Sequence, residues 1–190
     1  MSLHELLLEL TSGDDPRAEA AALAIGAYGS QAVAILAPLL HSGDADHRWW
    51  AVRGLAELPG EVAGEYLIQA LKDPDPAVRQ CAALGLSRNA ADAAVPALVE
   101  AMSSEDALLV RLAANALASI GAQAVPALLN ILEGEGGPVR MEAARALAHI
   151  GDHRSIPALF KALDEDSALL EYWANEGLER MGVGMVFFKP

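Results

Sequence analysis

Residues Val125–Leu132, with the sequence VPALLNIL, decide the fold, because the same pattern returns along the chain. Close copies are VPALVEAM at Val95–Met102 and IPALFKAL at Ile156–Leu163, and looser copies are VAILAPLL at Val33–Leu40 and GEYLIQAL at Gly64–Leu71. Within a copy, apolar residues recur at offsets of three and seven, and in most copies also at zero. These offsets share one face of an α-helix. Each copy is therefore predicted to be a short helix with one apolar stripe, and a proline such as Pro126 suits its first turn.

A second helical pattern lies between these copies and is defined by a column of arginines. The column contains Arg17, Arg48, Arg79, Arg111 and Arg140, and ends with Glu171. Three residues later the chain always has alanine, at Ala20, Ala51, Ala82, Ala114, Ala143 and Ala174. A small residue at a fixed helical position predicts that a neighbouring helix crosses close to it. The pair Ile150-Gly151 illustrates how these helices are expected to stop, since glycine accepts the left-handed backbone of a helix C-terminus.

Together the two patterns predict an all-α protein built as an α-solenoid of about six helix-pair repeats. One such unit cannot bury its apolar stripes alone, whereas stacked units form a continuous core. The predicted array covers residues 1–182, with a half repeat at 1–12, repeats that start near residues 14, 44, 73, 104 and 135, and a terminal helix at 167–181. Residues 183–190, VGMVFFKP, are expected to cap the last apolar face or, alternatively, to dock on a partner.

The phrase DPDPAVR at Asp73–Arg79, the alanine-rich helix, the Ile-Gly stop and the Val-Pro-Ala-Leu restart resemble the short HEAT-like repeats of the phycobilisome-lyase type. The resemblance extends over residues 1–182. It implies a right-handed superhelix with the arginine-column helices on the convex side and the Val-Pro helices on the concave side. It also implies that the arginines bond to acidic loop residues between neighbouring repeats. It says little about function, because scaffolds, lyases and hydroxylases share this repeat.

Composition limits the classes of partner and the cellular location. The chain has 26 acidic and 13 basic residues and a net charge of -13, with no basic run, so it is expected to repel a nucleic-acid backbone. This also disfavours a HEAT-like DNA glycosylase. There is no run of 18 apolar residues and no signal peptide, and Cys81 is the only cysteine. We therefore expect a cytoplasmic protein that does not bind membranes and has no intramolecular disulfide.

Three groups of residues invite a chemical interpretation, and for each the structural interpretation is stronger. His41, Asp44, Asp46 and His47 share one loop and could hold a metal, but this loop is an ordinary inter-repeat turn where Asp serves as a helix cap. His149 and His153 are separated by the stop at Gly151. Cys81 is predicted to be a small core residue, not a nucleophile.

Di-iron hydroxylases with this repeat carry His-Glu pairs just after the arginine column. Only Glu142 remains here, with no histidine before it. We therefore expect no metal, no cofactor and no catalytic residue.

Two sets of residues are predicted to contact a partner. The first is a polar ladder on the Val-Pro helices, expected to line the groove: Gln69, Lys72, Glu100, Asn130, Lys161, Glu133 and Asp164. The second is the aromatic pairs Trp49-Trp50 and Tyr172-Trp173, in which the first residue should point outward and the second partly inward. Simple solvation of the ladder and packing of the aromatics are the competing interpretations.

The sequence thus favours a non-catalytic scaffold that binds a protein or peptide. The alternative is a lyase or chaperone-like subunit that acts on a carrier protein, similar to phycobilin lyases; a HEAT-like metalloenzyme is a weaker alternative.

Overall fold

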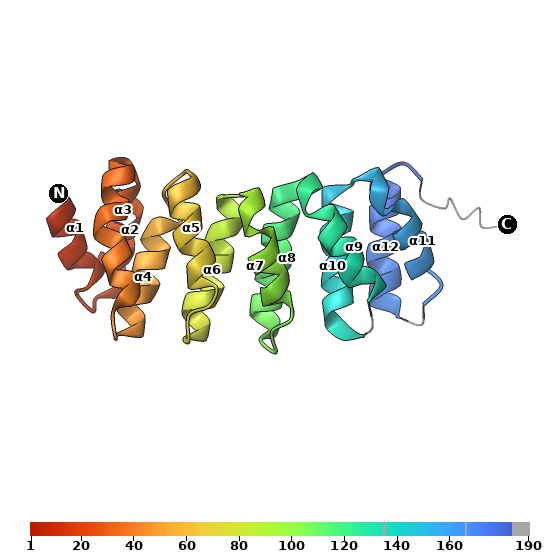
Figure 1. Ribbon diagram of the computed structural model, residues 1–190, viewed down its shortest axis with the longest axis horizontal. Helices are drawn as coiled ribbons and strands as arrows, with labels where there is room; N and C mark the ends of the chain where they lie inside the picture. Colours follow the sequence, from red (N-terminus) through yellow and green to blue (C-terminus); the bar gives the residue numbers. More distant parts are fainter. Residues whose placement is uncertain (135, 166, 184–190) are drawn as a thin grey trace.

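The structure is a computed structural model that describes residues 1–134, 136–165 and 167–183. The described residues form α-helices joined by turns and short 3-10 helices, and contain no β-strand. Pairs of helices follow one another along the long axis of the molecule, with α1 at one end and α11 and α12 at the other (Figure 1). Their bounds are α1 Leu3–Leu10, α2 Asp15–Ile25, α3 Ser30–Leu36, α4 Ala45–Leu55, α5 Glu61–Ala70, α6 Pro76–Arg88, α7 Val95–Met102, α8 Ala107–Ile120, α9 Val125–Glu133, α10 Gly137–Ile150, α11 Ile156–Ala162 and α12 Ala168–Arg180. The prediction of an all-α solenoid is confirmed.

The acidic turns between helices act as N-terminal caps. The side chain of Asp106 accepts hydrogen bonds from the backbone N–H groups of Leu108 and Leu109 at 3.0 and 3.1 Å. Equivalent caps are Asp14 on α2, Asp44 on α4, Asp75 on α6 and Ser167 on α12, whereas the cap residue of α10 is Gly136, which has no side chain to accept a hydrogen bond. A carboxylate at this place both satisfies free N–H groups and meets the positive end of the helix dipole. Part of the negative charge of the chain therefore serves to start helices.

Counting from the cap residue gives the true register of the repeats. The seventh residue after the cap of every even-numbered helix is an alanine with no exposed surface: Ala21, Ala51, Ala82, Ala113, Ala143 and Ala174. The predicted alanine column is thus correct in four repeats, but it is displaced by one residue at Ala20, which is exposed, and at Ala114. The displacement arises because Arg17 and Arg111 lie three and five residues after their caps, whereas Arg48 lies four residues after its cap.

The even-numbered helices pack closely on one another along the array. Each one contacts the next directly, from α2 to α12, whereas consecutive odd-numbered helices barely touch. In a stack of helix pairs, the row with the closer spacing lies on the shorter arc. The even-numbered row therefore forms the inner, concave side, and the odd-numbered row forms the outer side.

This arrangement contradicts the sidedness implied by the resemblance to the lyase-type repeats. The arginine-column helices are the inner ones and the Val-Pro helices are the outer ones. The physical reason is the small side chains of the even-numbered helices, where alanines and glycines allow backbones to approach. At Gly85, for example, an added Cβ atom would meet the Cβ atom of Ala56 at 2.9 Å.

Two arginines of the predicted column connect neighbouring repeats. Arg48 donates to both carboxylate oxygens of Asp73 at 2.8 and 3.0 Å, and Arg140 donates to those of Glu165 at 2.6 Å each. The hydrogen bond from Arg140 lowers the pKa of Glu165. The expectation of arginine–carboxylate pairs between repeats is therefore confirmed at these two positions, which share the same distance from the helix cap.

Arg17 also pairs with a carboxylate, since it donates to both oxygens of Glu9 in the preceding helix α1 at 2.6 Å each, but Arg79 and Arg111 do not repeat this contact within the described chain. Arg79 donates to backbone oxygens of its own loop, and Gln80 bonds to Asp106 of the next repeat at 2.8 Å. Arg111 is out of register by one residue.

Candidate functional site

Side chains two, five and nine positions after each cap share one face of the even-numbered helices, which we call the inner stripe, and all of them except Arg145 are at least partly exposed. It comprises Pro16, Glu19, Leu23, Asp46, Trp49, Arg53, Ala77, Gln80, Leu84, Leu108, Arg111, Asn115, Pro138, Met141, Arg145, Leu169, Tyr172 and Glu176. Among the described residues, ten large hydrophobic side chains are exposed, and five of them lie on this stripe: Leu23, Leu84, Leu108, Leu169 and Tyr172. The inner side of the solenoid is thus its most apolar exposed face.

The charges of the inner stripe balance, in contrast to those of the whole chain. The stripe has three acidic and three basic residues, whereas the chain has a net charge of -13. Arg53 pairs with Glu19 of the preceding repeat and with Glu57 in the turn that follows its own helix, and Arg88 donates to Glu57 at 2.9 Å. Burial lowers the pKa of Arg53, but the hydrogen bonds that Arg53 donates to Glu19 and Glu57 outweigh it and raise the pKa overall. A face that is apolar and nearly neutral suits a protein or peptide surface.

An open cleft lies at the amino-terminal part of the inner stripe, between α2, α4 and α6. Its volume is about 650 Å³, and its lining is Asp15, Pro16, Glu19, Asp46, Trp49, Trp50 and Ala77. Trp50 is only 9% exposed and forms the floor, while Trp49 is half-buried. The two indole rings are perpendicular, with centroids 4.7 Å apart. The predicted outward and inward orientation of this pair is therefore confirmed.

A second aromatic group lies at the other end of the stripe, on α12. Tyr172 is exposed, and its ring contacts that of Trp173 edge-on, with centroids 5.0 Å apart. His149 of α10 packs edge-on against the same Trp173 ring at 5.6 Å. Partial burial, with a contribution from Arg180, lowers the pKa of His149.

Between the two aromatic groups lies a buried ion pair. Arg145 donates to Glu142 at 2.7 Å, and both residues are less than a tenth exposed. This contact accounts for the single glutamate at the position where hydroxylases of this repeat class carry His-Glu pairs.

The predicted polar ladder lies on the opposite side from the inner stripe. Gln69, Glu100, Asn130 and Lys161 belong to α5, α7, α9 and α11, and Lys72 follows α5 directly. All five are exposed, as a polar ladder requires, but they belong to the outer row. Their predicted place on the concave side is therefore wrong, because the close packing of the even-numbered helices reverses the curvature that the resemblance implied.

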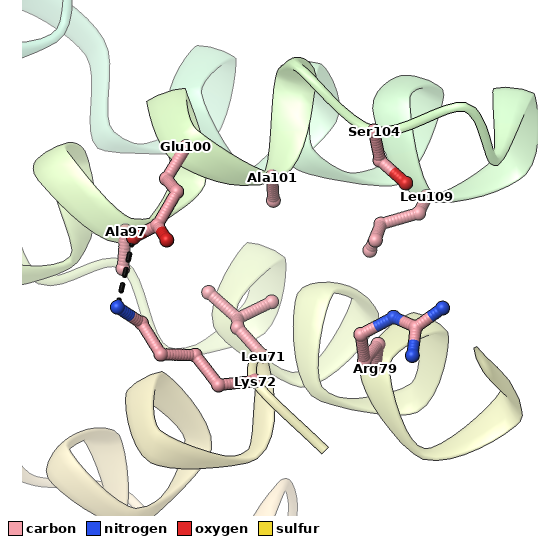
Figure 2. Close-up of a pocket in the computed structure, with 8 residues that line it drawn as sticks. All are labelled: Leu71, Lys72, Arg79, Ala97, Glu100, Ala101, Ser104 and Leu109. Atoms are coloured by element: carbon pink, nitrogen blue, oxygen red, sulfur yellow. Dashed lines mark ion pairs between the residues drawn. The ribbon is translucent and has the colours of Figure 1, made fainter. Parts of the chain in front are cut away.

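Two ladder residues nevertheless border a pocket (Figure 2). Lys72 and Glu100 form an ion pair at 2.9 Å on one side of it, while Arg79 and Leu109 lie on the other. The pocket has a volume of about 340 Å³ and lies where α5 and α7 meet the beginnings of α6 and α8. Both members of the ion pair are about two-thirds exposed, so the pair contributes little to stability.

The remaining chemical candidates have structural roles. Asp44 caps α4, and His47 lies 3.9 Å from Asp44 and 3.4 Å from the Ser42 hydroxyl. Nowhere in the described ranges do three or more His, Cys, Asp or Glu side chains converge as metal ligands. Cys81 is a buried core residue, as predicted, and burial raises the pKa of its thiol to about 12.

Two expectations concern the chain as a whole. No helix within the described residues has the length and hydropathy needed to span a bilayer. The proposed cap or docking tail, residues 183–190, lies outside the described residues except for Val183, which is exposed.

Sequence reasoning found the aromatic pairs but missed Leu84, Leu108 and Leu169. These leucines look like core residues in an alanine- and leucine-rich helix. Counting from the Asp or Ser cap would have placed them on the same face as Trp49, because the offsets of two, five and nine fall within one helical stripe.

The stacked helix pairs and the long inner stripe define a helical-repeat solenoid. The sequence profile of HEAT repeats matches residues 34–118, 64–138 and 111–179, and these matches together cover most of the chain. The chain therefore belongs to the HEAT repeat family. No curated protein matches the chain.

Several solved structures share the fold. An engineered protein is 27% identical over 97% of this chain and 98% of its own, with a TM-score of 0.58. The complex of CpcE and CpcF of phycocyanin lyase from Nostoc sp. PCC7120 is also 27% identical, covers 96% of this chain and 77% of its own, and has a TM-score of 0.58. A designed armadillo repeat protein in complex with the peptide (KR)4 is 18% identical, covers 95% of this chain and 100% of its own, and has a TM-score of 0.60. At 18% identity, the similarity to the designed armadillo repeat protein shows only a shared fold.

Proposed function

We propose that this protein is a non-catalytic scaffold that binds a peptide or protein segment along the inner stripe. The observation that carries the proposal is the gathering of exposed hydrophobic side chains on that face. Half of the large exposed hydrophobic residues in the described chain lie there, although the stripe has only 18 of the 190 residues. Exposed apolar patches of this kind on a water-facing surface are typical of interaction sites.

The stripe has the composition of a protein contact. Aromatic and arginine side chains contribute most of the binding energy in many interfaces. The stripe has Trp49 toward one end, Tyr172 at the other end and Arg111 between them. The direct packing between consecutive even-numbered helices supports these side chains from below. A preformed surface loses little entropy when a partner binds.

Affinity measurements on matched variants test this proposal. Peptides selected from a random displayed library would be titrated against the wild type, Leu84→Ser and Val62→Ser. Leu84 and Val62 are both exposed, at 45% and 57%, but lie on inner and outer helices respectively. We expect Leu84→Ser to weaken binding by about 1–2 kcal/mol, from the apolar surface removed, and Val62→Ser to leave it unchanged.

A triple variant tests the outer ladder directly. If replacing Gln69, Asn130 and Lys161 with alanine abolishes binding while Leu84→Ser has no effect, the binding site lies on the outer row and the proposal fails.

A second candidate is a lyase or chaperone-like subunit that acts on a carrier protein. The similarity to the phycocyanin lyase complex favours it. The absorbance spectrum of the protein purified from its native host tests this candidate. A bound tetrapyrrole would absorb visible light and support the lyase role, whereas a colourless protein that retains a peptide partner would support the scaffold.

A further inference from the structure

We infer that the cleft beside Trp49 binds a basic side chain, arginine in preference to lysine, of the peptide that occupies the inner stripe. The inference rests on the proposed function and adds the chemistry of one subsite. It follows from the walls of the cleft, from the charges on its rim, and from the absence of a basic residue among its lining side chains.

The walls of the cleft suit the stem and the planar head of an arginine. The lining is aromatic at Trp49 and Trp50 and aliphatic at Pro16 and Ala77. Because the two indole rings are perpendicular, the face of one ring can contact a ligand while the edge of the other ring packs beneath it. A guanidinium group stacks favourably on an indole face, and its aliphatic stem packs on apolar surface.

The rim of the cleft is negative. Asp15, Glu19 and Asp46 lie on it, and neither Lys nor Arg is part of the lining. Glu19 is already paired with Arg53. Asp15 and Asp46 make no ion pair with any other described residue, so both carboxylates are available to a ligand.

Helix dipoles do not cancel this charge. Asp15 and Asp46 lie in the first turns of α2 and α4, and each helix N-terminus carries roughly half a positive charge. Two full carboxylate charges, with the cap residues Asp14 and Asp44 behind them, exceed this. The cleft is therefore complementary to a cation with apolar surface, and its volume of about 650 Å³ exceeds the size of one side chain.

A pair of peptides separates this inference from the proposed function. One is an acetylated, amidated octapeptide of alternating arginine and leucine, and the other has citrulline in place of every arginine. In both peptides the leucines can contact the inner stripe, but arginine carries a positive charge and citrulline does not. Binding would be measured by calorimetry at about 0.15 M salt, where long-range attraction to the acidic protein is screened.

The wild type is expected to bind the arginine peptide at least tenfold more tightly than the citrulline peptide. Asp46→Asn and Trp49→Leu are each expected to weaken binding of the arginine peptide by about three- to tenfold and to weaken binding of the citrulline peptide clearly less. Trp49→Phe keeps an aromatic ring, but one that attracts a cation more weakly, so its affinity for the arginine peptide should lie between those of the wild type and Trp49→Leu. The control Asp164→Asn removes the same charge from an exposed outer position and should change affinity by less than about twofold.

Three other outcomes would each contradict the basic subsite. If both peptides bind equally, the inner stripe binds peptides but the basic subsite is wrong. If Asp164→Asn weakens binding as much as Asp46→Asn, only the net charge attracts the peptide, and the subsite is again wrong. If neither peptide binds, the result contradicts the subsite and the peptide-binding function together.

Discussion

Replacing Gly177 with alanine tests the close packing of the even-numbered helices. Gly177 lies in the C-terminal half of α12, where an added Cβ atom would meet Leu159 Cδ1 at 2.9 Å and Ala148 Cα and Cβ at 3.1 Å each. Carbon atoms normally rest about 3.5–4.0 Å apart. The Leu159 side chain can turn away, but the Ala148 Cα atom belongs to the backbone of α10. The helix must therefore move outward to accept the methyl group.

The expected magnitude follows from two opposing effects. Overpacking of this kind costs about 1–3 kcal/mol, whereas alanine in place of glycine within a helix contributes about 1 kcal/mol. The difference is a net loss of up to about 2 kcal/mol in the free energy of unfolding. The matched control is Gly64→Ala in α5, where no atom lies within 4 Å of the added Cβ atom, so only the helix preference acts. That variant should gain about 0.5–1 kcal/mol.

Urea unfolding of the three proteins, followed by helical circular dichroism and by tryptophan fluorescence, gives the comparison. Trp173 lies on the same helix as Gly177 and reports its local loosening. Because repeat arrays can unfold in parts, the whole transition should be compared, not the midpoint alone. If Gly177→Ala is as stable as Gly64→Ala, the even-numbered helices do not approach each other as closely as described.

Three further predictions concern ionisable groups. The Cys81 thiol, buried and with a pKa of about 12, should not react with a thiol reagent at pH 8 until the protein unfolds. The pKa of His149 is lowered in the folded protein, so when the pH falls below the ordinary histidine value of 6.5 the unfolded chain takes up a proton that the folded chain does not. The wild type should therefore lose stability between pH 7 and pH 5, and His149→Gln should lose less, as measured by unfolding at the two pH values. Glu142→Ala should destabilise by about 3–5 kcal/mol in thermal or urea unfolding, because it leaves Arg145 buried without its partner, whereas the double variant Glu142→Leu, Arg145→Met should be close to the wild type.

The fold was predictable because its signals are local and repeated. Helical periodicity in VPALLNIL, acidic caps such as Asp75 and glycine stops such as Gly151 each act within one turn of helix, and each is present in the structure as expected. Gly151 does adopt the left-handed conformation, with φ of 66°. Repetition then specified stacking without any knowledge of long-range contacts.

The side of the solenoid that forms the groove was not predictable from these local signals. It depends on how closely two rows of helices pack, and this spacing is a sum of small effects at residues such as Gly85 and Ala82. The one-residue displacement at Ala20 had a similar origin. The arginine column predicts the register of the repeats, but exposed arginines tolerate shifts along the helix that a buried alanine does not.

Oxidative footprinting by hydroxyl radicals, with and without a library-selected peptide, tests the central claim that the inner stripe is the binding surface. The reactive side chains Trp49, Met141 and Tyr172 lie on the stripe, while Phe160 is exposed on the outer helix α11. We predict that the bound peptide slows oxidation of one or more of the three stripe residues and leaves Phe160 unchanged. Protection of Phe160, with unchanged oxidation of Trp49, Met141 and Tyr172, would contradict the claim that the inner stripe binds the peptide.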